Sequence, residues 1–274
     1  MWRPRLGSAL VASVLIAPGA VAAAPQHPAG RQVRPSLAAV PILMYHVVAA
    51  PPPDAPFPGL YVAPADFAAQ IDALVRAGYH GVTQDQMLAA WRGAGRLPSR
   101  PIVISFDNGY RSQYERALPI LTGVGWVADE NLQLHGLPSS AGGLSAREVR
   151  ALVAAGWELD TQGWSHADLT AVGPARLAFE IGVARRRIRR LYGVAANWFC
   201  YPSGRFNPAV VAAVEAAGYV GATTVVPGWA RPTDNLYELP RLRVLAGTSP
   251  AALLAQIRAA AADPLPPSSY LAAG

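Results

Sequence analysis

The sequence of 274 residues contains no lysine and only one cysteine, Cys200. A single cysteine cannot form a disulfide within the chain, so a folded domain depends on its core for stability. The net charge of +6 comes from arginine alone, in a chain rich in alanine, glycine and proline. This pattern indicates a composition bias, and we interpret the arginine-rich segment 184–193 as a solvated helix face. The sequence therefore predicts no nucleic-acid partner.

Long hydrophobic runs are also absent, apart from one near the N-terminus. Arg3 and Arg5 precede an apolar stretch at 6–20, which a proline interrupts, and small residues at 20–22 suit a cleavage site. We expect a signal peptide over 1–22 and an exported protein, periplasmic or extracellular, without an integral membrane span after signal removal. A retained signal anchor is the alternative. No cysteine follows the apolar run, which argues against a lipid-anchored form.

The remaining chain divides into a linker, one domain and a tail. Residues 23–38 are rich in Pro, Gly, Gln and Arg and form a predicted flexible linker, and 263–274 form a predicted C-terminal tail. Residues 39–262 alternate between apolar runs and helical patterns. Expected strands lie at 41–46, 81–82, 101–106, 126–128, 157–159, 198–201, 219–223 and 239–244, and expected helices at 64–78, 145–155, 175–192, 208–217 and 249–261. This alternation predicts an α/β domain with mostly parallel strands.

A junction between helix and strand recurs three times, as RAGYH (76–80), AAGWE (154–158) and AAGYV (216–220). In each copy, a glycine that can adopt the left-handed conformation ends a helix, and an aromatic residue opens a strand. A repeated unit of this kind predicts either a barrel or an open parallel sheet.

Polar groups follow several of the predicted strands. The stretch IVISFDNGY (102–110) ends an apolar run in Asp107 and Asn108, and His46 ends the first strand. In parallel α/β folds, functional groups gather beyond the carboxyl ends of the strands. We therefore expect these residues and the segment after 157–159 to lie together.

Four motifs resemble those of the polysaccharide deacetylases that share the NodB homology fold. They are SFDNGY (105–110), WELDTQGWSHADLT (157–170), FCYPSGRFN (199–207) and LPRLRV (239–244). The opening PILMYHVV (41–48) resembles the branch that contains the biofilm poly-N-acetylglucosamine deacetylases. The resemblance extends from about Pro41 to Leu254, and it implies a distorted (β/α) barrel of the NodB type.

The resemblance also implies a chemistry, the metal-dependent hydrolysis of acetyl groups on an envelope or extracellular polysaccharide. In the family a divalent metal, often zinc, is held by one carboxylate and two histidines and polarises the acetamide carbonyl. Asp107 matches the general base, and His46 matches the general acid. The metal positions fall on Asn108, Gln162 and His166.

The third motif implies substrate contacts at Tyr201 and Pro202. Trp164, within the second motif, is the expected platform for a sugar ring, since an indole face can stack on one. The expected partner is accordingly an acetylated polysaccharide. Cys200 precedes these contacts inside an apolar strand, and we interpret it as a small buried apolar residue.

Amides occupy two of the three expected metal positions, Asn108 and Gln162. Zinc prefers thiolate, imidazole and carboxylate ligands, and neither amide brings charge. Changes in groups that only orient the ligands typically reduce metal affinity or activity by about 10–100-fold. Two lost ligands are therefore expected to reduce them by on the order of 100–10,000-fold. The sequence predicts a retained scaffold with an impaired metal site.

Three functions remain open on this evidence. The first is an exported hydrolase that removes N-acetyl or O-acetyl groups, and the second is a non-catalytic carbohydrate-binding protein that kept the groove and lost the metal. The third is metal-free acid/base hydrolysis by Asp107 with Glu158 or Asp160. A serine hydrolase is disfavoured, because YPSGRF lacks the glycine spacing of a nucleophile elbow. Asp107 as a helix cap and His46 as a core histidine are the structural alternatives.

Overall fold

A computed structural model of the protein describes Met1, residues 36–137 and residues 142–262. The expected signal peptide, the linker up to residue 35 and the expected C-terminal tail lie outside the described residues, apart from Met1. Among the helices that are described, none is both long and apolar enough to cross a membrane.

A sheet of nine strands organises the described part of the chain. The strand order is β7-β6-β5-β4-β3-β1-β8, with β2 beside β3 and β9 beside β1. The bounds are β1 Val40–Tyr45, β2 His80–Val82, β3 Pro101–Asn108, β4 Asp129–Leu132, β5 Glu158–Thr161, β6 Trp198–Cys200, β7 Gly221–Thr223, β8 Trp229–Ala230 and β9 Leu242–Arg243. Within this sheet only the pairing of β1 with β8 is antiparallel. The sheet curls into part of a barrel, which confirms the predicted (β/α) barrel with mostly parallel strands.

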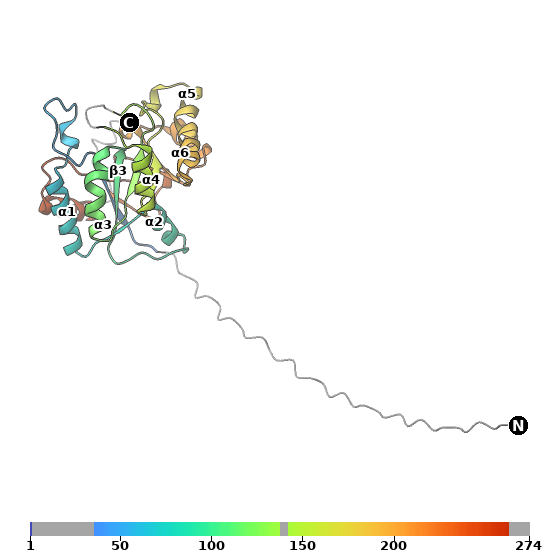
Figure 1. Ribbon diagram of the computed structural model, residues 1–274, viewed down its shortest axis with the longest axis horizontal. Coiled ribbons are helices and arrows are strands. Elements are labelled where there is room, and N and C mark those ends of the chain that lie inside the picture. Colours follow the sequence, from blue (N-terminus) through green and yellow to red (C-terminus); the bar gives the residue numbers. More distant parts are fainter. Residues whose placement is uncertain (2–35, 138–141, 263–274) are drawn as a thin grey trace. The chain divides into compact units, whose positions relative to one another are not determined.

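Helices connect the strands and cover the sheet, and α3 and α4 lie beside β3 in Figure 1. Their bounds are α1 Pro64–Arg76, α2 Gln84–Trp91, α3 Leu118–Gly123, α4 Ala146–Ala154, α5 Pro174–Ala178, α6 Ala184–Tyr192, α7 Pro208–Ala216 and α8 Pro250–Ala262. One π-helical segment, Gln113–Ala117, leads into α3, and another, Phe179–Val183, joins α5 to α6. Capping boxes at Thr83 and Ser145 start α2 and α4, since each side chain accepts a backbone N–H and the third helical residue bonds back.

The three repeated junctions adopt the predicted conformation. Gly78, Gly156 and Gly218 have φ angles of 80°, 87° and 82°, the left-handed region that glycine enters without a steric cost. Each glycine follows the end of a helix, and the chain then turns into the next strand. The junctions therefore set the recurring helix–strand geometry of the barrel.

Most expected strands differ from the structure by one or two residues at an end, and two differ more strongly. The segment 126–128 was expected to be a strand because it is apolar, but β4 begins at Asp129. Trp126 instead donates its backbone N–H to Leu121 at the end of α3, and pairing with β3 starts only at Asp129. The expected strand at 239–244 shortens to Leu242–Arg243. Helices α2 and α3 and strand β8 were not predicted.

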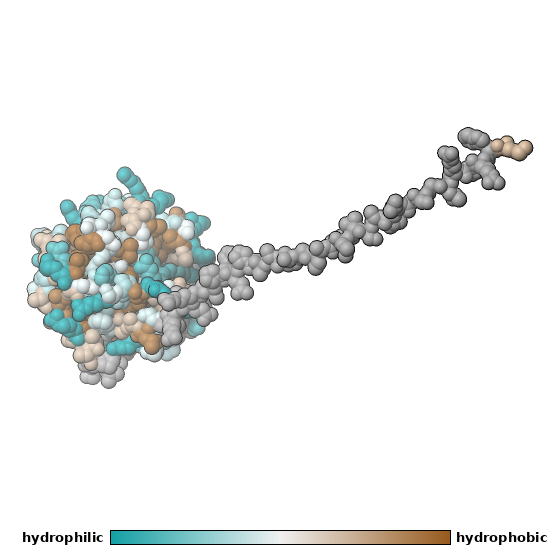
Figure 2. All heavy atoms as spheres, turned by 90° about the horizontal axis from the view of Figure 1, so that it is seen from below, coloured by the Kyte–Doolittle hydropathy of each residue, from teal (hydrophilic) through white to brown (hydrophobic). Residues whose placement is uncertain are grey.

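Apolar packing fixes the position of β3, the strand that ends in Asp107. The strand is buried along its whole length, as expected for a parallel strand covered on both faces. On one face the ring of Phe106 stacks on Trp157, with centroids 5.2 Å apart, and meets Tyr45 and Phe67. On the face of the described residues seen in Figure 2, hydrophobic and hydrophilic side chains are interspersed. The strand that carries Asp107 is therefore held in the core of the domain.

Candidate functional site

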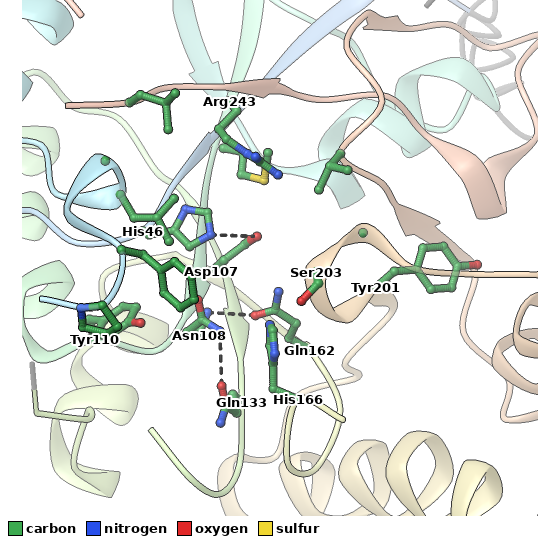
Figure 3. A pocket seen from close by; sticks show the side chains of 18 of the residues that line it. His46, Asp107, Asn108, Tyr110, Gln133, Gln162, His166, Tyr201, Ser203 and Arg243 are labelled. Carbon is green, nitrogen blue, oxygen red and sulfur yellow. Dashed lines mark hydrogen bonds and ion pairs between the residues drawn. The ribbon is translucent and has the colours of Figure 1, made fainter. Parts of the chain in front are cut away.

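The carboxyl ends of β1, β3, β5 and β6 meet around a pocket of about 730 Å³ (Figure 3). The predicted site residues that line it are His46, Asp107, Asn108, Gln162, His166 and Tyr201. The parallel register brings them together, because Asn108 pairs with Leu132 and Leu132 pairs with Thr161. The ends of β3 and β5 are consequently level, as expected from the sequence.

Asp107 is held at the base of this pocket by an arginine. Arg241 donates from Nη1 to Oδ1 at 2.7 Å and from Nη2 to Oδ2 at 2.9 Å, and both residues are buried. Asn131 adds a hydrogen bond from Nδ2 to Oδ1 at 2.9 Å. Burial raises the pKa of Asp107, but Arg241 and the other partners outweigh it, and the pKa falls to about 2. Asp107 is therefore ionised at neutral pH, and its oxygens are engaged by donors.

His46 lies beside Asp107 without a close hydrogen bond. Its Nε2 is 3.9 Å from Asp107 Oδ2, and its Nδ1 has no partner among the described residues. Burial lowers the pKa of His46 to about 4, although the charge of Asp107 opposes the shift. The imidazole is therefore neutral at pH 7 and carries no extra proton for a leaving group.

Asn108 and Gln162, the two amides at expected metal positions, are joined by a hydrogen bond. The backbone N–H of Asn108 donates to Gln162 Oε1 at 3.1 Å, and Asn108 Nδ2 donates to Gln133 Oε1 at 3.2 Å. Gln133 in turn donates from Nε2 to the carbonyl of His135 at 2.6 Å. The side-chain oxygens of Gln162 and Gln133 thus already accept hydrogen bonds. Asn108 Oδ1 and Gln162 Nε2 have no hydrogen-bond partner within residues 36–137 and 142–262, so both are available to a ligand.

Three pocket residues other than glycine have left-handed backbone conformations. The φ angles are 77° at Asn108, 58° at His166 and 54° at Ser203. Such conformations are uncommon outside glycine and cost energy, and they cluster at functional sites in proteins. Asparagine tolerates this region best among them, since its short polar side chain can bond locally. Three of the five described non-glycine residues with positive φ therefore lie in the wall of this pocket.

Two of the expected substrate contacts do not line this pocket. Pro202 is buried, and Trp164 packs edge-on against Phe179, with centroids 5.3 Å apart. Trp164 instead lines a second pocket of about 360 Å³, which shares Gln133 and Gly136 with the first. The second pocket therefore adjoins the first, and Trp164 lies along the same surface at some remove from Asp107.

The carboxylates that were considered for metal-free hydrolysis also lie away from the pocket. Asp160 is fully buried and accepts the backbone N–H of Trp198 at 2.8 Å, and Glu158 accepts that of Asp85 at 2.8 Å. Neither residue lines the pocket with Asp107. The structure therefore does not assemble the pair of carboxylates that this mechanism requires.

Several pocket residues were not identified from the sequence. Phe57, in the proline-rich loop, is 68% exposed and lines the pocket, and Arg243 of β9 lines it beside His46. No local pattern indicated either residue, because the first lies in an irregular loop and the second in a two-residue strand. Arg241 lies within the motif LPRLRV, which indicated the family but not the contact with Asp107.

The stretch VADEN (127–131) brings three polar residues into strand β4. Asp129, Glu130 and Asn131 of β4 are fully buried. Asn131 faces Asp107, and Asp129 shares that face of the sheet because side chains alternate along a strand. Glu130 points to the opposite face, and neither of its carboxyl oxygens has a partner among the described residues. Burial raises the pKa of Glu130 well above its usual value, and the charge of Asp107 adds to the shift.

Comparisons with known proteins agree with these motifs. The family model for polysaccharide deacetylases matches residues 94–222. YxkH of Bacillus subtilis is 26% identical over 223 residues, which cover 80% of this chain and 76% of that protein. The poly-β-1,6-N-acetyl-D-glucosamine N-deacetylase of Escherichia coli K12 is 43% identical over 51 residues, which cover 19% of this chain and 8% of that enzyme.

A solved structure supports the fold independently. The deacetylase PplD of Streptococcus pyogenes, in complex with acetate, matches with a TM-score of 0.74 at 24% identity, covering 81% of this chain and 99% of that chain. At this identity the likeness concerns the fold. The family match spans the first three motifs, and the sequence resemblance to the NodB type is confirmed. Residues 94–222 therefore match the polysaccharide deacetylase family, and the solved structure extends the likeness in fold to 81% of the chain.

Proposed function

We propose that this protein is an exported, polysaccharide-binding member of the deacetylase family whose pocket recognises an acetylated sugar without a catalytic zinc ion. The observation that carries the proposal is the amide network of Asn108, Gln162 and Gln133. It occupies the positions at which the family places a carboxylate and a histidine.

The donor set around His166 does not fit zinc. Zinc sites in proteins use thiolate, imidazole and carboxylate ligands. Here one imidazole remains, Gln162 Oε1 already accepts a hydrogen bond, and Asn108 Oδ1 is uncharged. Asp107 cannot replace the missing carboxylate, since Arg241 binds both of its oxygens. Metal-dependent deacetylation is consequently not the activity that these residues favour.

The same pocket suits an acetylated sugar through hydrogen bonds. The backbone N–H of Asn108 donates to Gln162 Oε1 and so orients the Gln162 amide, whose Nε2 can donate to a ligand. Ser203 and Tyr110 add hydroxyl groups to the lining. An acetyl carbonyl accepts from donors of this kind. Phe57 offers an exposed aromatic ring at the same pocket, and an aromatic ring can cover the apolar face of a pyranose. Together these groups support recognition of an acetylated glycan.

The sequence supports export, and one relative supports a class of glycan. Arg3 and Arg5 precede the apolar run at 6–20, as in a secretory signal. The Escherichia coli relative is named for a poly-N-acetylglucosamine substrate, and its local match supports an acetylated glucosamine polymer as the first ligand to test. The proposed partner is therefore an acetylated polysaccharide outside the cytoplasm.

Deacetylation remains the second candidate, and the proximity of His46 to Asp107 favours it. Their separation of 3.9 Å keeps the acid/base pair of the family within one pocket. Asp107 is ionised, as a general base requires, but burial lowers the pKa of His46 to about 4, which disfavours the protonated imidazole that a general acid needs. We therefore rank glycan binding first.

Calorimetric titration of the purified protein with an N-acetylglucosamine oligomer tests the proposal. We expect binding that is unchanged by EDTA, without release of acetate. Gln162→Ala should weaken binding by roughly tenfold, since it removes the free amide donor. Thr122→Ala, at an exposed position on α3 outside the pocket lining, is the control and should bind as the parent does. Binding that EDTA abolishes, or acetate release that zinc stimulates, would overturn the proposal.

A further inference from the structure

The charges around the pocket are unevenly balanced. Apart from two histidines, the side chains with formal charge that line it are Asp107 and Arg243. The negative charge of Asp107 is met by Arg241 at 2.7 Å and 2.9 Å, beneath the pocket. The guanidinium of Arg243 has no hydrogen-bond or ion-pair partner within the described residues. The pocket therefore presents one uncompensated positive charge to a ligand.

The backbone of Arg243 is fixed by the sheet. Strand β9 pairs with β1, with Leu242 opposite Leu43 and Arg243 opposite Met44. Gln256 of α8 donates from Nε2 to the carbonyl of Arg243 at 3.1 Å. Figure 3 shows the guanidinium reaching over the pocket on the same side as His46. The charge is thus carried by a rigid strand, while its end remains exposed to solvent and to a ligand.

The adjoining second pocket has the same sign of charge. Apart from His135, its lining side chain with formal charge is Arg187 of α6, which lies with Trp164 and Tyr192. Gln133 and Gly136 line both pockets, so a chain of sugars can continue from one into the other. Within the described part of the chain, neither lining includes a carboxylate other than Asp107. These two adjoining pockets, called the groove below, each have an arginine in their lining.

We propose that this groove selects an anionic polysaccharide, with Arg243 pairing with a carboxylate or phosphate group next to the acetylated sugar. Arginine suits this role, because its planar guanidinium binds either group through two parallel hydrogen bonds. A deacetylated amino sugar carries a positive charge, which Arg243 would repel. The inference rests on the proposed glycan-binding function and specifies the class of glycan.

The test compares three acetylated oligosaccharides of equal length on the same protein. They are a neutral N-acetylglucosamine oligomer, an O-acetylated hexuronate oligomer and a phosphodiester-linked N-acetylglucosamine oligomer. We expect at least one anionic probe to bind roughly tenfold or more tightly than the neutral one, since hydrogen bonds to charged groups are the stronger ones. The carboxylate and phosphate probes distinguish the two sources of the anionic group. Added salt should reduce the difference.

Three variants at two arginines separate the charge at the pocket from the net charge of the protein. Arg243→Gln should weaken binding of the anionic probe far more than binding of the neutral probe, and so remove the preference. Arg258→Gln on α8 removes the same charge outside both pocket linings, and it should retain the preference. Arg243→Lys should retain part of the preference, because lysine keeps the positive charge but cannot form the two parallel hydrogen bonds of a guanidinium.

Equal binding of all three probes, or an unchanged preference in Arg243→Gln, would overturn the inference and leave the proposed function standing. A failure of every probe to bind would overturn the proposed function, and the inference with it.

Discussion

Arg241 binds both carboxylate oxygens of Asp107 inside the barrel, with distances of 2.7 Å and 2.9 Å. The pair joins β3 to the segment before β9 and lies directly beneath the ligand pocket. Because both side chains are buried, neither charge has water as an alternative partner. The pair therefore stabilises the floor of the site and keeps Asp107 ionised.

Removal of Arg241 is expected to destabilise the fold strongly. Arg241→Met leaves the carboxylate of Asp107 buried and unpaired, which typically costs about 3–5 kcal/mol. The pKa of Asp107 lies below its usual value, so its contribution to stability is present above pH ~4 and is lost as the pH falls toward about 2. Denaturant unfolding at pH 7 and pH 3 should accordingly show a larger deficit at pH 7.

A double variant provides the control for this pair. Arg241→Met with Asp107→Asn removes both charges, and it should lose less stability than the sum of the two single variants. Additive losses would contradict a direct coupling between the two side chains.

The buried carboxyl group of Asp129 is expected to make the free energy of unfolding fall as the pH rises. Burial raises its pKa well above the usual value, and Glu158 and Asp85 add to the shift while the N–H of Gln84 opposes it. The folded protein therefore retains a proton that the unfolded chain loses above pH ~4. Asp129→Asn removes this difference. The free energy of unfolding of Asp129→Asn should exceed that of the parent from about pH 4 upward. The difference should grow by up to about 1.4 kcal/mol per pH unit.

Guanidinium unfolding of both proteins at pH 4.5, 6 and 7.5 checks this prediction. Asp72→Asn on α1 is the matched control, because Asp72 is exposed, and it should change stability by less than about 0.5 kcal/mol. Parallel pH profiles for the parent and Asp129→Asn would show that Asp129 is ionised in the folded state.

The fold could be predicted from the sequence because its signals are local. The three glycine junctions and the buried runs at β1 and β3 follow from backbone sterics and burial, and both appear as expected. The boundary of β4 was misplaced, since apolar character does not reveal where a strand begins to pair. Helix α2 was missed, because it is short and only its capping box at Thr83 marks it.

Among the residues of the site, those that lie within sequence motifs could be predicted. Asp107, Asn108 and Gln162 were identified by their place in motifs, whereas Phe57 and Arg243 reach the pocket through loops and pairing that lie far apart in the sequence. The exclusion of Trp164 from the main pocket depends on its packing against Phe179. Such contacts follow from tertiary packing, which local sequence patterns do not encode.

Phe57 is expected to contribute to glycan affinity without stabilising the fold. Its ring is 68% exposed, so Phe57→Ala should leave the midpoint of thermal unfolding nearly unchanged. If the ring stacks on a sugar, its loss should weaken binding of an acetylated oligosaccharide by roughly threefold to tenfold. Phe57→Trp should restore binding, and Val75→Ala, an exposed site on α1, serves as the control. Unchanged affinity in Phe57→Ala would exclude stacking at this position.

The most direct measurement of the account is a zinc titration of the purified parent protein beside an Asn108→Asp, Gln162→His double variant. The account predicts no stoichiometric zinc binding by the parent, because amides bring no charge and Gln162 Oε1 is already engaged. The double variant regains a carboxylate and an imidazole beside His166 and should bind zinc. Stoichiometric zinc bound by the parent would contradict the account and restore metal-dependent deacetylation as the leading function.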